Sequence, residues 1–275
     1  MKRSHLEKFS RLLALILIVV FLSFANPRFL GMRNVMNILN QASLNIMLAV
    51  GMTFTMLIAG IDLSVGSVLA LTSVLAARFF QSGSPVDMAI GVAVSLALGA
   101  FVGSLNGAAV VYLKLPPFLV TFGTQQIARG FAYLYMSGII YNNFDAKFLF
   151  LGKGNVLNVP TPVIVVAVLL PIIGLLLNKT TMGRKIYMVG ANRSSARYSG
   201  ISIHHTSVFA YAMSGLMAAL AGLVYISRLN AAEAVIGETF AQQAIVAAAI
   251  GGVSFKGGSG SVFGLFKRIC GRNPA

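Results

Sequence analysis

The sequence predicts an all-α fold, a polytopic bundle of transmembrane helices in which some helices are broken or re-entrant. Composition is the first reason: 57% of the 275 residues are hydrophobic and only 10% are charged, whereas a soluble domain is about 45–50% apolar and about 25% charged. The mean hydropathy of +0.84 is the second. The third is a polar stretch bracketed by glycines within apolar sequence, GIDLSVGS from Gly60 to Ser67. The lipid bilayer is therefore the first expected partner.

The first apolar run, LLALILIVVFLSFA from Leu12, follows a basic flank that holds Lys2, Arg3, Lys8 and Arg11. A secretory signal peptide also has a basic start and a short apolar region. No A-x-A cleavage site follows, because the chain continues as NPRFLGMRN. We therefore interpret this run as a first span that resembles a signal anchor, with the N-terminus in the cytoplasm.

Further apolar stretches follow along the chain. Their approximate ranges are 35–60, 63–80, 88–113, 118–137, 162–177, 207–226 and, shorter, 243–251, and a last candidate starts at Gly260. A span needs about 20 mostly apolar residues, and several of these stretches are short or contain polar groups. We expect such helices to be surrounded by protein.

Small residues recur every four positions in the stretch 88–113, at Ser95, Gly99, Gly103 and Gly107. On a helix this spacing forms a ridge along one face, where the backbone of another helix can approach closely. The ridge favours a compact bundle.

The distribution of basic residues predicts the orientation in the membrane. If the N-terminus is inside, the inner segments before residue 260 carry 11 Lys or Arg and the outer segments carry 6. Basic loops are retained in the cytoplasm, and the cluster between Lys179 and Arg197 decides the assignment. The protein is thus expected to be a multi-pass protein of a bacterial inner membrane.

An aspartate between two apolar runs is energetically costly, so Asp62 needs an explanation. Gly60 and Gly66 allow the helix to break here, and a carboxylate inside a membrane bundle is a functional candidate. A structural alternative is that Asp62 or Ser64 caps the helix that begins near Val65. Asp62 could also lie at the membrane surface.

A second stretch, GVSFKGGS from Gly252 to Ser259, resembles GIDLSVGS in its pattern of glycine, β-branched, large apolar and serine residues. Both follow a run of small apolar residues. Transporters often contain two structural repeats with broken helices at corresponding places, so two internal repeats are one interpretation and a chance match is the other.

Polar side chains within the spans are candidates for lining a pathway, since sugars require amides and hydroxyls as hydrogen-bonding partners. These candidates are Asn106, Thr121, Thr124, Gln125, Gln126 and Arg129. Hydrogen bonding between helices is the alternative role. Arg129 needs a partner within a span, and the acids available to it are Asp62, Glu233 and Glu238.

The segment TTMGRKIYMVGANRSSARYSGISI, residues 180–203, is basic and rich in glycine. Its part SSARYSGI could form a short helix across the membrane surface. The alternative is a basic loop that only retains this side of the protein in the cytoplasm.

Several signatures together resemble the membrane permease subunit of bacterial ABC importers for sugars, the ribose-type family. They are GMTFTMLIAGIDLSVGSVLAL from Gly51, LPPFLVTFGTQQIARG from Leu115, PTPV from Pro160, MGRKIYMVGANRSSARYSGI from Met182 and AIVAAAIGGVSFKGGSGSVFG from Ala244. The resemblance implies import of a monosaccharide or similar small polar solute. It also implies a periplasmic binding protein, a cytoplasmic ATP-binding subunit and a second permease copy or paralogue as partners.

In the family, the basic loop resembles the coupling segment that rests on the ATPase. The matching positions here are Gly183, Arg184, Gly190, Asn192, Ala196, Arg197, Ser199 and Gly200. Arg193 replaces the usual Glu, and Tyr198 replaces the usual Leu.

Residues 1–264 are expected to form the permease domain and residues 265–275 an atypical basic tail, because LFKRICGRNPA departs from the apolar family pattern. We expect a truncated gene or a natural short variant.

Other functional classes find little support. The chain has no Gly-x-x-x-x-Gly-Lys-Ser/Thr phosphate loop, so we expect it to bind no cofactor and a separate subunit to use ATP. His5, His204 and His205 have no zinc-binding spacing, and the basic residues are spread over loops, which argues against nucleic acid. A membrane-embedded enzyme would need clustered catalytic groups. An ion-coupled secondary transporter remains the main alternative, with Asp62 as its support.

Overall fold

The computed structural model describes residues 13, 16–17, 19–26 and 28–260, and it divides into two units, residues 1–42 and 43–275. Each unit is described by itself. The helices are α2 (Met32–Leu57), α3 (Val65–Ala77), the 3-10 helix η1 (Arg78–Phe80), α4 (Pro85–Tyr112), α5 (Pro117–Met136), α6 (Ala146–Lys153), α7 (Thr161–Lys179), α8 (Thr181–Ala191), α9 (Arg193–Tyr198), α10 (Ile203–Leu229) and α11 (Phe240–Ile250). The expected all-α class is confirmed.

In the first unit, residues 13, 16, 17 and 19–25 are helical, and a turn precedes α2. The side-chain amide of Asn34 donates a hydrogen bond to the carbonyl of Phe29 (2.8 Å) and holds this turn. The basic flank at residues 2–11, the last candidate span beyond its first residue, Gly260, and the tail 265–275 lie outside the described residues.

The long apolar stretches are helices close to their predicted ranges. Four of them, α2, α4, α7 and α10, are long and apolar enough to cross a membrane by length and composition. The stretch 63–80 becomes α3 and η1, and 243–251 becomes α11, so both are shorter than a full span. The shorter helix predicted at 243–251 is confirmed, whereas the stretch 63–80 was not singled out as short.

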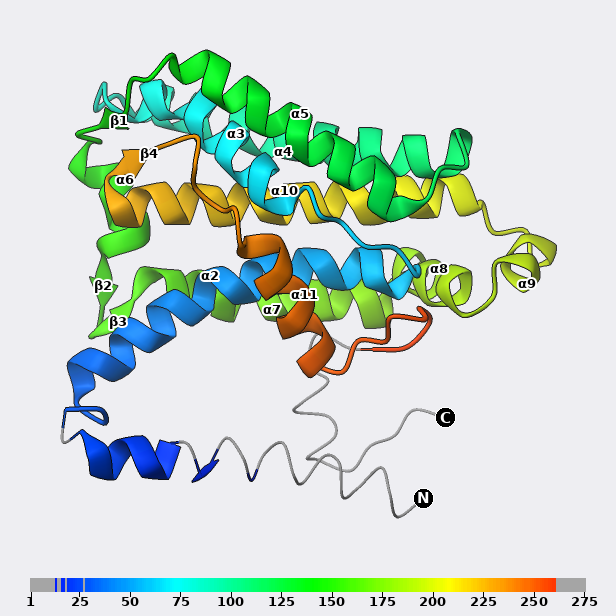
Figure 1. Ribbon diagram of the computed structural model, residues 1–275, viewed down its shortest axis with the longest axis horizontal. Helices are drawn as coiled ribbons and strands as arrows, with labels where there is room; N and C mark the ends of the chain where they lie inside the picture. Colours follow the sequence, from blue (N-terminus) through cyan, green and yellow to red (C-terminus); the bar gives the residue numbers. More distant parts are fainter. Residues whose placement is uncertain (1–12, 14–15, 18, 27, 261–275) are drawn as a thin grey trace. The chain divides into compact units, whose positions relative to one another are not determined.

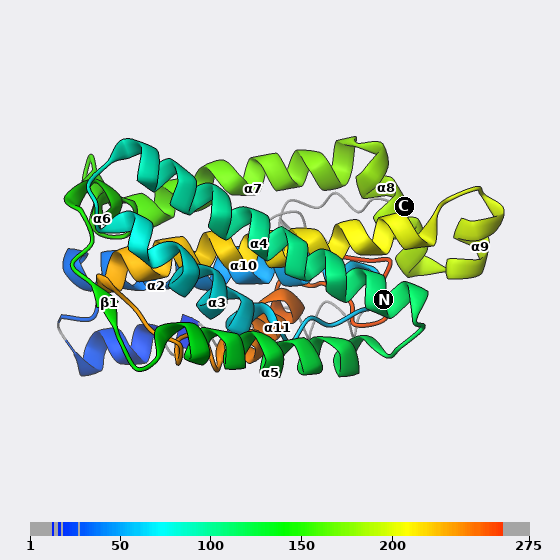
Figure 2. The ribbon, with the colours of Figure 1, turned by 90° about the horizontal axis from the view of Figure 1, so that it is seen from above.

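Helices α4 and α10 cross at an angle (Figure 2) and pack closely against each other. The ridge predicted on α4 lies in this contact: Ser95, Gly99, Gly103 and Gly107 are all buried. A Cβ atom at Gly103 would collide with the backbone of Tyr211 on α10. The predicted close approach of two backbones is confirmed.

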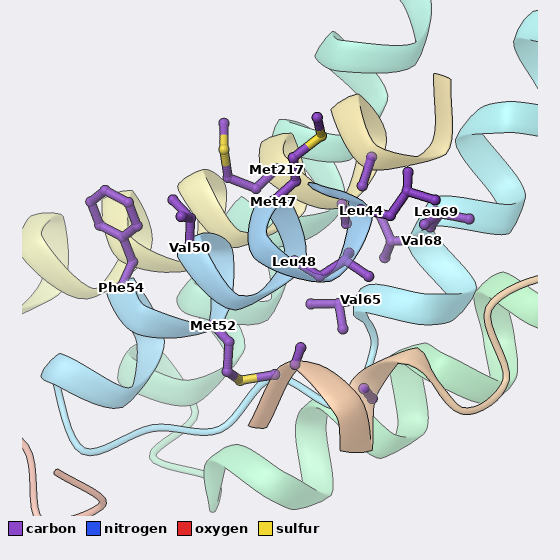
Figure 3. Close-up of a cluster of buried hydrophobic side chains, with 14 of the residues drawn as sticks. Leu44, Met47, Leu48, Val50, Met52, Phe54, Val65, Val68, Leu69 and Met217 are labelled. Carbon is purple, nitrogen blue, oxygen red and sulfur yellow. The ribbon is translucent and has the colours of Figure 1, made fainter. Parts of the chain in front are cut away.

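Helix α3 lies inside the bundle, against α4, α5 and α10. Twelve of its 13 residues are buried. Figure 3 shows Val65 and Val68 of α3 facing Leu48 of α2 in the apolar core, with Met217 of α10 nearby. A short helix is stable here because protein surrounds its ends, so it does not need to reach from one lipid surface to the other.

The four two-residue strands of the described chain form two antiparallel pairs. They are β1 (Tyr141–Asn142) with β4 (Ala231–Ala232), and β2 (Asn155–Val156) with β3 (Val159–Pro160). Beside them lies α6, which the sequence analysis did not predict. Asp145 caps α6 by accepting a hydrogen bond from the N–H of Lys147 (2.9 Å), and the ring of Phe148 stacks on Phe80 with centroids 3.7 Å apart.

The long helices of the second unit run between two ends, where the shorter helices, the strands and several connections lie (Figures 1 and 2). One end holds α6 with the paired strands, and the other holds α8, α9 and the connection from α4 to α5. The predicted coupling loop is therefore separated from the strand end by the length of the bundle helices.

Candidate functional site

The break between α2 and α3 places a carboxylate inside the protein. Helix α2 ends at Leu57, Ala59 adopts a left-handed conformation (φ 58°), and α3 begins at Val65. The N–H of Gly60 donates to the carbonyl of Thr55 (2.8 Å) and closes the end of α2. Asp62 lies between the two helices with only 1% of its surface exposed, so protein surrounds its side chain. Its depth in the membrane stays a prediction.

Three donors satisfy the Asp62 carboxylate. Its Oδ1 accepts hydrogen bonds from the backbone N–H of Ser64 (3.0 Å) and from the Ser64 hydroxyl (2.5 Å). Its Oδ2 accepts one from the Ser214 hydroxyl on α10 (2.7 Å). Ser64 occupies the position before α3 but makes no side-chain cap bond. The predicted cap is therefore wrong in detail. Asp62 accepts a hydrogen bond from the N–H of Ser64, the residue before α3, and a second oxygen of the same carboxylate connects the break to α10 through Ser214.

The hydrogen bonds continue from Asp62 across two more helices. The Ser64 hydroxyl accepts a bond from the Asn106 amide on α4 (2.9 Å), and the Asn106 carbonyl oxygen accepts one from the Thr124 hydroxyl on α5 (2.5 Å). Donors and acceptors thus follow one another in a single direction toward Asp62. We call Asp62, Ser64, Asn106, Thr124 and Ser214 the polar relay; it joins the break to α4, α5 and α10.

The candidate pathway residues occupy different environments. Asn106 and Thr121 are buried, and the Thr121 hydroxyl lies 3.2 Å from the carbonyl oxygen of Ile61. Hydrogen bonding between helices, the alternative role, accounts for these two residues and for Thr124. Gln125 is half-buried and Gln126 is exposed on α5, so these amides are the candidates that remain free to meet a solute.

Arg129 binds backbone carbonyls. Its guanidinium Nη1 donates hydrogen bonds to the carbonyls of Ala234 and Ile236 (2.8 Å to the second). Both carbonyls belong to the segment 231–239 that connects α10 to α11. From the sequence, Asp62, Glu233 and Glu238 were the acids available to Arg129. In the structure the hydrogen bonds of the guanidinium go to the two carbonyls, and Glu238 of the same connector interacts with it electrostatically.

The same connector crosses the beginning of α3. A Cβ atom at Gly66 would collide with the carbonyl of Gly237, which itself has a φ of +81°. The backbones can pass this closely only because Gly66 and Gly237 both lack a Cβ atom. The connector is therefore fixed on α5 by Arg129 and on α3 by Gly66.

The predicted coupling loop consists of two capped helices. The Thr180 hydroxyl accepts a hydrogen bond from the N–H of Gly183 at the start of α8 (3.1 Å), and the Asn192 side chain accepts one from the N–H of Ser195 at the start of α9 (3.0 Å). Helix α9 confirms the short helix expected near residues 194–201, whereas α8 was not predicted. Of the candidate positions, Arg184, Asn192, Arg197, Ser199 and Gly200 are exposed, Gly190 is half-buried, and Gly183 and Ala196 are buried.

Gly190 on α8 forms a junction with two distant segments. A Cβ atom at Gly190 would collide with the carbonyl of Leu57, where α2 ends. The same carbonyl accepts a hydrogen bond from the N–H of Gly258 (2.8 Å). The Tyr187 hydroxyl donates to the carbonyl of Gly260 (2.8 Å), and burial raises the pKa of this phenol. The two glycine-rich stretches thus meet beside α8; their origin as internal repeats stays a prediction.

A long, mostly helical chain with apolar spans and a broken central helix defines a multi-pass membrane protein. Residues 34–267 match the family described as "Branched-chain amino acid transport system / permease component", and the chain belongs to this permease family. The resemblance stated from the sequence is confirmed. The curated relatives that match are named as permease proteins.

Curated relatives extend along most of the chain. It is 40% identical to the ribose import permease protein of Haemophilus influenzae, over 92% of this chain and 79% of the relative. It is 37% identical to that of Bacillus subtilis, over 96% of this chain and 83% of the relative. It is 35% identical to the D-allose transport system permease protein of Escherichia coli, over 91% of this chain and 76% of the relative. No solved structure matches.

Proposed function

We propose that this chain is the transmembrane subunit of an ATP-driven importer and forms the pathway for a monosaccharide or similar small polar solute. The observation that carries the proposal is the identity of 35–40% with permeases named for ribose and allose import. A permease named for galactose and methyl galactoside import, from Salmonella typhimurium, is 32% identical. These relatives favour a sugar importer over an ion-coupled secondary transporter.

Two soluble partners follow from this proposal. A cytoplasmic ATP-binding subunit hydrolyses ATP, since this sequence contains no phosphate loop, and a periplasmic binding protein delivers the solute. The coupling loop, α8 with α9, meets the ATP-binding subunit. Its exposed side chain Arg184, which lies outside the groove described below, and the left-handed turn at Gly200 (φ +76°) support this role. The N-terminus lies in the cytoplasm, as the basic residues of the sequence predict.

The pathway lies between two permease copies, with α5 on its wall. Helix α5 exposes the Gln126 side chain, and a Cβ atom added at Gly123 or Gly130 of the same helix would meet no other part of the protein within 4 Å. A second helix can therefore approach α5 without steric conflict. A pathway that receives its solute from a binding protein needs hydrogen-bonding groups and no tight site.

Uptake into proteoliposomes tests the function. The chain is reconstituted with an ATP-binding subunit and a solute-binding protein of the same organism, and radiolabelled ribose, allose and galactose are offered separately. We expect uptake of at least one sugar that requires both ATP and the binding protein and persists with a protonophore. Uptake that survives without ATP and collapses with the protonophore would instead identify a secondary transporter.

A further inference from the structure

A basic groove lies where α9 approaches the connection between α4 and α5. It encloses about 550 Å³. Four of its lining residues carry basic side chains, and the other lining residues are apolar or hydroxyl-bearing. The basic residues are Lys114, Arg193, Arg197 and His204. Among the described residues that line this groove none is acidic, so the cations are not neutralised within it.

The cations lie on ordered elements. Arg193 and Arg197 are four residues apart on α9, so they share one face of that helix, and both line the groove. Lys114 is in the α4–α5 connection with a left-handed backbone (φ 55°). Helix α9 is fixed beneath by the buried Ala196, whose carbonyl accepts a hydrogen bond from the N–H of Ile201 (3.0 Å).

A ring contact holds the opposite wall. His204, at the start of α10, stacks on Tyr112 at the end of α4, with ring centroids 4.9 Å apart. This contact joins the two helices that carry the floor of the groove. The separation between Lys114 and the α9 arginines is therefore set by packed elements before any ligand arrives.

An apolar shoulder flanks the basic groove. Tyr112, Leu113 and Phe118 are 61%, 67% and 59% exposed, and they lie in the last turn of α4, just after it and in the first turn of α5. In water this exposed surface would be unfavourable. Exposed apolar side chains continue along both helices, at Phe101 and Leu105 of α4 and at Phe122 and Phe131 of α5. Cations beside such a surface match an amphiphile with an anionic head group.

We propose that the basic groove binds an anionic phospholipid. The phosphate contacts Lys114, Arg193 and Arg197, and the acyl chains extend along Tyr112, Leu113 and Phe118. Basic pockets between helices on the cytoplasmic side bind such head groups. The inference rests on the proposed function only in that α9 faces the cytoplasmic leaflet. A bound lipid joins α9 to the α4–α5 connection and thereby positions the coupling loop.

Native mass spectrometry tests the groove with the chain and its partner subunits released from nanodiscs of equal parts phosphatidylglycerol and phosphatidylcholine. We expect the unaltered complex to retain more phosphatidylglycerol than phosphatidylcholine. Lys114→Gln, Arg193→Gln and Arg197→Gln should each reduce this preference about fivefold. The matched control is Lys179→Gln with Lys185→Gln, two exposed cations of the same cytoplasmic region outside the groove, and it should retain the lipid.

A second variant tests the apolar shoulder: Leu113→Ser with Phe118→Ser should also lower retention, while the charge of the groove is unchanged. Equal retention by the unaltered protein, the groove variants and the control would overturn the proposal. Loss of the ATP-binding subunit in the groove variants, with lipid retention unchanged, would assign the groove to an acidic protein segment instead. Lipid retention needs neither sugar nor ATP, so its failure is distinct from a failure of uptake.

Discussion

Asp62 illustrates how a charged side chain is accommodated at the centre of an apolar bundle. Its carboxylate accepts from Ser64 and Ser214, and all these partners are donors. Asp62→Leu would leave the donors without an acceptor, at about 1–3 kcal/mol for each one that stays buried. Asp62→Asn keeps one acceptor oxygen, and the hydroxyl of Ser214 can rotate to accept from the new amide.

We therefore expect Asp62→Leu to lose most of the folded protein in detergent and Asp62→Asn to keep most of it. Fluorescence-detected size-exclusion chromatography with a heating series measures the difference. If Asp62→Leu were as stable as the unaltered chain, the polar relay would have no structural role. If Asp62→Asn were stable but inactive in uptake, the negative charge itself would be required for transport.

Two glycine-to-alanine substitutions, one on α8 and one on α5, provide a matched pair of single-residue variants. Gly190→Ala places a methyl group against the Leu57 carbonyl, so we expect a stability loss of about 1–3 kcal/mol, the range of overpacked sites. Gly123→Ala on α5 meets open space and should stabilise its helix by up to about 1 kcal/mol. Thermal unfolding of the purified chain compares them, and equal midpoints for the two variants would contradict the junction.

At the scale of elements, the connector 231–239 depends on one side chain of α5. Arg129→Leu would leave the carbonyls of Ala234 and Ile236 without their donor. We expect faster amide hydrogen exchange in peptides from the connector and from the beginning of α11, with α8 and α9 unchanged as the internal control. Unaltered exchange in the connector would show that Gly66 and Gly237 hold it without Arg129.

The elements also show how far the sequence could be read. Hydropathy located the long helices, because burial in lipid or protein demands apolar residues throughout a span. It missed α8, since Gly183 and Gly190 suggested a loop, although both are small because backbone lies against them. It also missed the eight-residue α6. Asp62 could be recognised as a candidate site residue because a carboxylate in apolar sequence is costly. Its partner Ser214 could not, because Ser214 is 152 residues away in the sequence and only the fold brings the two side chains together.

The whole molecule has a predicted orientation. With Cys270 replaced, a single cysteine at Ser194 in α9 should be shielded from an impermeant thiol reagent in intact cells and labelled in inverted vesicles. A cysteine at Ser82 is the control, because Ser82 is exposed at the opposite end of the bundle, between η1 and α4, and should react from outside. Reversed labelling of the two positions would invert the topology.

The junction at Gly190 also sets an order of events during synthesis. The Leu57 carbonyl receives its hydrogen bond from Gly258, 201 residues later in the chain. At the usual rate of about 5–20 residues per second, the ribosome needs roughly 10–40 s to reach the second residue. Throughout that interval the Leu57 carbonyl lacks this hydrogen bond, although Gly190, which lies against the same carbonyl, is synthesised earlier. The end of α2 can therefore enter the membrane early, but its junction with α8 is complete only after Gly258 has been synthesised.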